Sequence, residues 1–231
     1  MDSKLSESAQ APDEKNVAAE KEVAAVDGLA YRFVKRSFDI VFSGVVTAVL
    51  VVPVAALGIA ISLESPGGPM FRQARVGKNG KQIRIFKLRS MYADAHEHPE
   101  RYLSEEQLAQ WRREQKVDND PRVTRIGRLL RKTSLDELPQ FLNVLIGDMS
   151  VVGPRPVTEE ETYEFGADRD LALSVRPGIT GLWQVTARND ATWESGERQR
   201  LELEYVRNRS IGMDLRIVLA TFGAVLKKTG K

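Results

Sequence analysis

The longest apolar stretch of the chain runs from Ile40 to Leu63 and contains no charged residue. With a rise of about 1.5 Å per residue, a helix over this stretch is long enough to cross a hydrocarbon core of roughly 30 Å. A buried helix in a soluble fold is the alternative, but soluble cores rarely contain so long a run without a charge. The pattern therefore predicts a membrane segment.

Pro53 interrupts the middle of this segment, where proline removes a backbone hydrogen bond and clashes with the preceding turn. Basic residues flank the segment on both sides, at 32–36 and again at 72–81. The positive-inside rule places each basic flank in the cytoplasm. We therefore expect a re-entrant hairpin that bends at Pro53 and returns to the same membrane face. A helix that crosses the membrane once is the alternative.

Shorter patterns predict the elements of a cytoplasmic domain. Residues 71–76 and 82–88 are predicted to pair as strands around the turn 77–80. A charged surface helix is expected over 93–115, and a helix with one apolar face over 215–226. Over 123–130, arginines recur opposite aliphatic side chains, which is typical of a basic amphipathic helix at a membrane surface. A solvated face on a core helix gives the same pattern.

Together these elements predict an α+β fold that is predominantly helical and membrane-associated, with interfacial amphipathic helices. The first residues are rich in Ala, Glu, Lys and Ser and contain no aromatic residue, so we expect a disordered polar tail over 1–28. The re-entrant hairpin is assigned to 29–66 and the cytoplasmic domain to 67–231.

Composition narrows the chemistry that the chain can perform. The net charge is only +2, and the basic helix lacks interleaved aromatic residues, so we expect no nucleic-acid partner. The absence of cysteine excludes disulfides, thiolate nucleophiles and zinc–thiolate sites. The histidines, His96 and His98, both lie in one charged segment. Acid–base or nucleophilic chemistry must therefore come from carboxylates, lysine, tyrosine or hydroxyl groups.

Two adjacent carboxylates, Asp136 and Glu137, lie where a helix is predicted to begin. Either Ser134 and Glu137 form a capping box, or Asp136 is itself the N-cap and Pro139 lies in the first turn. In both cases the positive potential of the helix N-terminus keeps Asp136 ionised, as a nucleophile or a Mg²⁺ ligand requires. Helix capping alone is the alternative role for this pair.

Arginines with restricted backbones surround the acidic pair in the sequence. Arg131 lies just upstream, and Arg155 lies between two prolines, which hold its guanidinium ready for bidentate contact with phosphate. A second such turn follows at Arg176-Pro177-Gly178. A solvated arginine in a surface loop is the alternative for each. Combined with the membrane segment, these residues indicate phosphoryl chemistry at a lipid surface, where positioning and charge neutralisation supply most of the catalysis.

Short motifs between residues 86 and 181 occur in an order and spacing that resemble one known family. The motifs are Phe86-Lys87-Leu88-Arg89-Ser90-Met91, Asp120-Pro121-Arg122-Val123-Thr124, Ser134-Leu135-Asp136-Glu137-Leu138-Pro139-Gln140, Gly147-Asp148-Met149-Ser150-Val151-Val152-Gly153-Pro154-Arg155-Pro156 and Arg176-Pro177-Gly178-Ile179-Thr180-Gly181. Arg36-Ser37-Phe38-Asp39, before the membrane segment, also fits. From about residue 31 onward, the chain resembles the bacterial sugar transferases, which are monotopic phosphoglycosyl transferases.

The resemblance implies a catalytic domain in which Asp136 is the nucleophile. It would attack the sugar-linked phosphorus of a UDP-sugar and expel UMP, and a polyprenyl phosphate such as undecaprenyl phosphate would then accept the sugar phosphate. Mg²⁺ would bind Asp136, and Glu137 would assist by orienting this pair or by handling a proton. The substrate-binding residues that the resemblance implies are Lys87, Arg131, Arg155 and, toward the nucleotide, Arg188.

The resemblance also places the catalytic domain on the cytoplasmic side of the bacterial inner membrane and allows a homodimer. It favours the enzymes that initiate exopolysaccharide with galactose phosphate or glucose phosphate. Two alternatives stay open: a Mg²⁺-dependent membrane phosphatase or pyrophosphatase, and a membrane-anchored assembly scaffold without activity. A requirement for the lipid acceptor separates the first from a transferase, and loss of function in Asp136→Asn separates the second.

Overall fold

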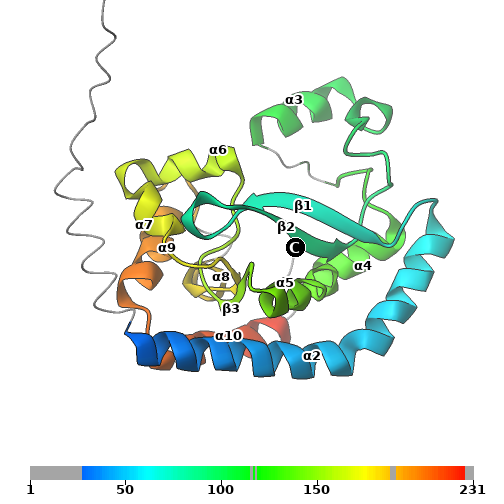
Figure 1. Cartoon of the computed structure of the whole chain (residues 1–231). Coiled ribbons are helices and arrows are strands. Elements are labelled where there is room, and N and C mark those ends of the chain that lie inside the picture. The colour runs from blue at the N-terminus through cyan, green and yellow to red at the C-terminus, as the bar shows by residue number, and fades with distance from the viewer. Residues whose placement is uncertain (1–27, 115–116, 118, 188–190, 227–231) are drawn as a thin grey trace, which may run out of the picture.

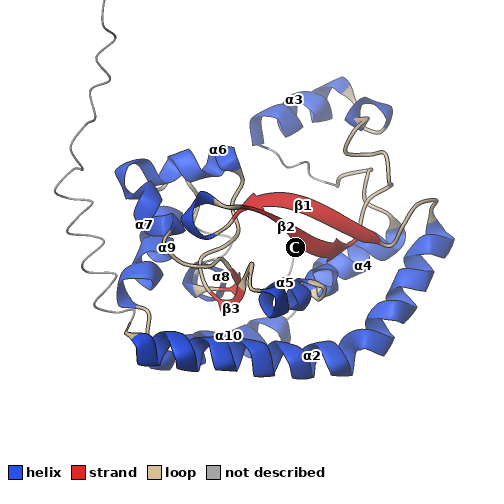
Figure 2. Ribbon diagram, in the orientation of Figure 1, coloured by secondary structure: helices blue, strands red, loops and turns tan. Residues whose placement is uncertain are grey.

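The structure is a computed structural model that describes residues 28–114, 117, 119–187 and 191–226. Except for Gly28, the predicted polar tail lies outside the described residues. The described chain is mostly helical and contains a pair of two-stranded sheets (Figures 1 and 2). The prediction of a predominantly helical α+β fold is therefore confirmed.

The elements follow one another in a mixed order along the chain. The helices are α2 (Leu29–Glu64), α3 (Glu105–Glu114), α4 (Arg125–Thr133), α5 (Gln140–Ile146), α6 (Glu159–Thr162), α7 (Arg169–Leu173), α8 (Leu182–Thr186), α9 (Glu197–Asn208) and α10 (Ile211–Leu226). The strands are β1 (Met70–Val76), β2 (Gln82–Leu88), β3 (Ser150–Val152) and β4 (Gly178–Thr180). Short 3-10 segments occupy Lys78–Gly80, Pro99–Arg101, Leu135–Glu137 and Tyr163–Asp168.

The predicted strand pair is confirmed as the antiparallel hairpin of β1 and β2. Its pairing runs from Met70 opposite Leu88 to Val76 opposite Gln82. Because side chains alternate along a strand, residues that face each other share one side of the hairpin. One side therefore carries Lys87 opposite Phe71, and the other carries Leu88 opposite Met70.

Helix α2 has 36 residues and is long and apolar enough to cross a membrane, by length and composition. Most of its apolar side chains are uncovered; Phe33 is 75 % exposed and Leu63 is 82 % exposed. Pro53 lies inside the helix, and Figure 1 shows one bent helix rather than two antiparallel arms. The helix is therefore continuous through Pro53, because a mid-helix proline can kink a helix without ending it, and the predicted hairpin is not confirmed. The return of both flanks to one membrane face stays a prediction.

Polar contacts fasten the first turns of α2 to the rest of the domain. Arg36 donates to two carbonyl groups near the end of α5 at 2.7 and 2.9 Å, where a cation complements the helix dipole. Asp39 is 1 % exposed and accepts hydrogen bonds from the hydroxyl of Ser150 and an amide of β3, both at 3.0 Å. The ammonium of Lys35 lies 3.0 Å from Asp214, in the first turn of α10.

The parallel pair β3 and β4 brings two distant motifs together. The amide of Gly153 donates to Thr180 at 2.9 Å, and the amide of Gly178 donates to Pro154 at 2.7 Å. A side chain on either glycine would collide with the facing backbone. The two proline–arginine turns that the sequence presents separately therefore share one tightly packed junction, and Arg155 extends from it.

Two predicted helices differ from the observed elements. Residues 93–104 form turns, including the 3-10 turn Pro99–Arg101, and α3 is the one α-helix among the described residues of the segment 93–115. The basic helix begins at Arg125, because the hydroxyl of Thr124 caps it by accepting the amide of Gly127 at 2.9 Å. Arg122 is therefore outside the helix and 3 % exposed, and it pairs with Asp120 at 2.7 Å. The predicted C-terminal helix is confirmed as α10.

Candidate active site

Asp136 and Glu137 lie on the single 3-10 turn between α4 and α5. Ser134 has a left-handed backbone (φ 56°, ψ 21°) that ends α4, and its side chain makes no capping hydrogen bond. Helix α5 then begins at Gln140, with Pro139 at its N-cap position. Neither predicted cap is therefore formed: Ser134 and Glu137 make no capping box, and Asp136 lies inside the 3-10 turn rather than at an N-cap. The left-handed residue and the proline leave room for only one turn, which carries both carboxylates.

The acidic pair faces two cations from different elements. The ammonium of Lys87, on β2, lies 3.2 Å from a carboxylate oxygen of Glu137. Arg131, in the last turn of α4, interacts electrostatically with Asp136 and donates to the hydroxyl of Ser90 at 2.9 Å. Both side chains of the Lys87–Glu137 pair are largely covered, so water screens this interaction only weakly.

The electrostatic setting of Asp136 differs from the sequence expectation. Burial raises the pKa of its carboxyl group, and the neighbouring Glu137 raises it further. Lys87 and Arg131 oppose this rise. The predicted stabilisation by a helix N-terminus therefore does not dominate, because Asp136 lies in a 3-10 segment of three residues and burial raises the pKa of its carboxyl group. In the described residues, these cations take over the role of stabilising the carboxylate.

Lys87 and Glu137 line one small pocket together with Arg155. The pocket lies on the side of the hairpin that carries Lys87, and its other polar lining residues are Gln73, Arg75, Gln140 and Gln184. None of these four was assigned a role in the site from the sequence. Alternation along β1 could have identified Gln73 and Arg75, because they share a strand face with Phe71, the partner of Lys87.

Arg155 is held by its backbone rather than by its side chain. Its amide donates to both carboxylate oxygens of Glu202 on α9, at 3.2 and 3.3 Å. Its guanidinium lies 5.8 Å from the ring centroid of Trp183, within cation–π range. Glu202 is 1 % exposed, and burial raises its pKa to about 7. The turn is thus anchored on α9 while the guanidinium is directed to the pocket.

The sequence of the chain can be compared with known proteins. Residues 30–228 match the family described as bacterial sugar transferase. The chain belongs to this family. The resemblance drawn from the motifs is therefore confirmed.

Named members of the sugar transferase family are similar to most of this chain. The UDP-galactose-lipid carrier transferase of Erwinia amylovora is 42% identical over 202 residues, which are 86% of this chain and 42% of that protein. The UDP-glucose:undecaprenyl-phosphate glucose-1-phosphate transferase of Escherichia coli is 38% identical, over 82% of this chain and 39% of its own length. The chain thus spans about two fifths of these relatives. Exopolysaccharide production protein ExoY of Rhizobium meliloti is 40% identical over 90% of both chains.

The remaining predicted residues of this sugar transferase fall elsewhere. Arg188 lies outside the described residues. Pro53 is exposed on α2 and lines no part of the pocket. No group of three or more acidic or histidine side chains that could hold a metal occurs in the described part of the chain. The adjacent carboxylates of Asp136 and Glu137 nevertheless suit Mg²⁺, which proteins often bind through one or two carboxylates plus substrate phosphates.

Proposed function

We propose that this protein transfers a hexose 1-phosphate from a UDP-sugar to undecaprenyl phosphate and releases UMP, as a first membrane step of exopolysaccharide synthesis. The substrates in the names of the similar proteins support this proposal. The observation that carries it is the buried Asp136 carboxylate, which faces Lys87 and Arg131 beside a pocket lined by Arg155.

In the first step, an oxygen of the Asp136 carboxylate attacks the sugar-linked phosphorus of the UDP-sugar. The bond from this phosphorus to the bridging oxygen breaks, and UMP leaves with the electron pair. In the second step, a phosphate oxygen of undecaprenyl phosphate attacks the same phosphorus. The aspartyl–phosphorus bond then breaks, the carboxylate is restored, and the sugar becomes linked to the lipid through a diphosphate.

The cations around the acidic pair stabilise negative charge and form no covalent bond with the substrate. Lys87 and Arg131 favour the ionised form of Asp136, which is the form that attacks. Arg155 suits a diphosphate oxygen, because a guanidinium fixed by its backbone loses little entropy on binding. Asp136 and Glu137 would hold Mg²⁺, which would neutralise charge on the donor diphosphate when bound. Glu137, which pairs with Lys87, would orient Asp136 and the metal ion.

Exposed apolar side chains support a position at the membrane. They extend beyond α2 to α5 and α10, where Ile146 is 63 % exposed and Leu219 is 62 % exposed. With basic residues on both flanks of α2, we infer that the helix enters the inner leaflet and returns, so that the catalytic domain lies in the cytoplasm. The predicted homodimer stays a prediction.

Release of UMP from a panel of UDP-sugars tests the function. Full-length protein in detergent, with Mg²⁺, is assayed with and without undecaprenyl phosphate, beside Asp136→Asn. We expect multiple turnovers that need both the lipid and Asp136. Continued release of sugar phosphate without lipid would indicate the phosphatase alternative, and no release with any donor from folded protein would refute the proposal.

A further inference from the structure

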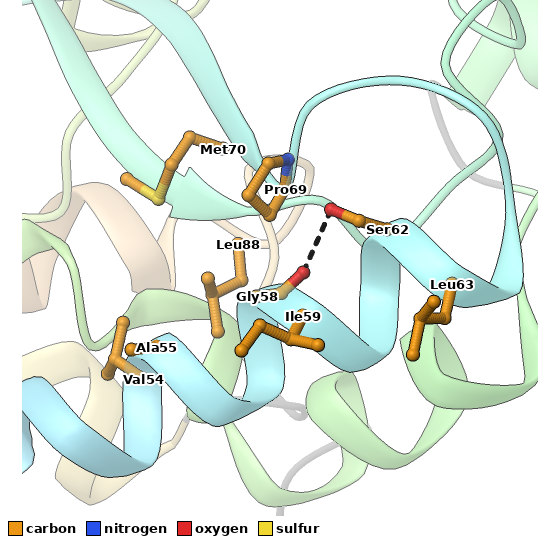
Figure 3. A pocket seen from close by; sticks show the side chains of 9 residues that line it. All are labelled: Val54, Ala55, Gly58, Ile59, Ser62, Leu63, Pro69, Met70 and Leu88. Atoms are coloured by element: carbon orange, nitrogen blue, oxygen red, sulfur yellow. Dashed lines mark hydrogen bonds between the residues drawn. The ribbon is translucent and has the colours of Figure 1, made fainter.

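A second pocket, an open groove, lies on the opposite side of the β1–β2 hairpin from the acidic pair. Its volume is about 430 Å³, within the usual range for small-molecule sites. Figure 3 shows that the last turns of α2 form one wall and that the ends of the two strands form the other. The wall residues include Ala55, Ile59 and Leu63 from α2, and Met70 and Leu88 from the hairpin.

The lining of this groove is almost entirely apolar. The one side-chain hydroxyl among the lining residues belongs to Ser62, and it donates to the carbonyl of Gly58 at 3.0 Å within the same helix. Ile59 and Leu63 are 63 % and 82 % exposed. A hydrocarbon ligand would cover such side chains at a gain of about 25 cal/mol per Å², whereas a polar ligand would find no group to bind.

The groove is joined to the active site through a small core cluster. Leu88 packs in one cluster with Leu130 and Leu135. Each of these leucines is next to a residue of the acidic pocket or its surroundings: Lys87, Arg131 and Asp136, respectively. Leu88 also lines the groove, so one packed cluster lies between the groove and the elements that carry the charged residues of the active site.

Arg89 fixes the turn that joins the two walls of the groove. Its guanidinium is 6 % exposed and donates to Ser65, Pro66, Gly67 and Gly68 in the turn between α2 and β1, at 2.7 to 3.1 Å. This turn sets the distance between the membrane helix and the hairpin. The groove is therefore a fixed feature of the fold.

We propose that this groove binds part of the isoprenoid chain of the acceptor lipid, next to its phosphate-bearing end. The inference rests on the proposed function, because that function supplies a lipid whose phosphate must reach Asp136. The groove opens along a helix suited to the membrane. Leu88 in its lining is next to Lys87 and packs in one cluster with Leu135, the neighbour of Asp136, so a chain lying in the groove starts close to the reacting groups.

Filling the groove tests the proposal, and the chain offers a matched control. Ala55 and Ala56 are neighbouring, exposed alanines of α2, and only Ala55 lines the groove. Ala55→Phe should raise KM for undecaprenyl phosphate about tenfold, which corresponds to the loss of roughly two buried methylene groups. The KM for the UDP-sugar should stay unchanged. Ala56→Phe should leave both values unchanged.

A photoreactive polyprenyl phosphate gives a second measurement that does not depend on a variant. It should label the segment around Met70, and undecaprenyl phosphate should suppress this labelling while phosphatidylglycerol does not. Equal kinetics in the two alanine variants, or equal competition by phosphatidylglycerol, would overturn the proposal while leaving the transferase function intact. A wild-type protein without transfer activity would instead refute the function on which the proposal rests.

Discussion

The buried carboxyl group of Glu202 should make the domain less stable as the pH rises. Its pKa is raised from 4.5 to about 7 in the folded protein, because burial disfavours the charged form. Between these values the unfolded chain binds fewer protons than the folded one. The stability contributed by the protonated group is therefore fully present below about pH 4.5 and lost as the pH rises through about 7.

The size of this effect follows from the two pKa values. Between about pH 5 and about pH 8, linkage predicts a loss of about 2.5 kcal/mol from this one group. For a domain of this size, that corresponds to a fall in Tm of about 5–10 °C. Glu202→Gln removes the titration but keeps an oxygen that can accept the amide of Arg155. The variant should therefore lose less stability over this pH range than the wild type.

Thermal unfolding in detergent at a series of pH values measures this difference directly. Glu204→Gln is the matched control, because Glu204 lies on the same helix but its side chain is 41 % exposed and pairs with Arg200. We expect the control to follow the pH dependence of the wild type. Parallel curves for the wild type and Glu202→Gln would show that this carboxyl group does not titrate as its burial indicates.

Three further changes give outcomes of known direction. Lys87→Met removes a charge that lowers the pKa of Asp136, so the acidic limb of the pH–rate profile should move to higher pH; an unmoved limb would contradict this. Lys35→Met removes the cation 3.0 Å from the buried Asp214, and should lower the free energy of unfolding, measured with denaturant, by about 3–5 kcal/mol. An unchanged free energy of unfolding would contradict this. Gly178→Ala forces a side chain into the facing backbone of Gly153, at a cost of about 1–3 kcal/mol in folding free energy. It should therefore lower the Tm measured by calorimetry, and an unchanged Tm would show that the two strands can move apart at this junction.

Elements with a clear hydrophobic period were the ones that the sequence could predict. The hairpin follows from alternation over seven-residue strands, and α10 from one apolar face. In contrast, β3 and β4 have three residues each, too few to show a period. They pair because Gly153 and Gly178 allow a close backbone approach, and that depends on partners distant in the chain.

The site was predictable in its residues but not in its local geometry. Motifs identified Asp136, Glu137, Lys87 and Arg155, of which the last three meet in one pocket. The backbone of Ser134 is left-handed, a conformation that serine rarely adopts, so a helix start was the natural interpretation of the segment. The anchoring of Arg155 by Glu202 joins residues 47 positions apart and has no signal in the local sequence.

The most direct test of the central claim is intact-protein mass spectrometry after incubation with a UDP-sugar and Mg²⁺, in the absence of lipid acceptor. A nucleophilic Asp136 predicts a mass increase equal to one sugar phosphate, located on the peptide that contains Asp136 and lost when undecaprenyl phosphate is added. Asp136→Asn should show no increase. Transfer activity without any such adduct, even at short times and low temperature, would contradict the claim that Asp136 carries the sugar phosphate.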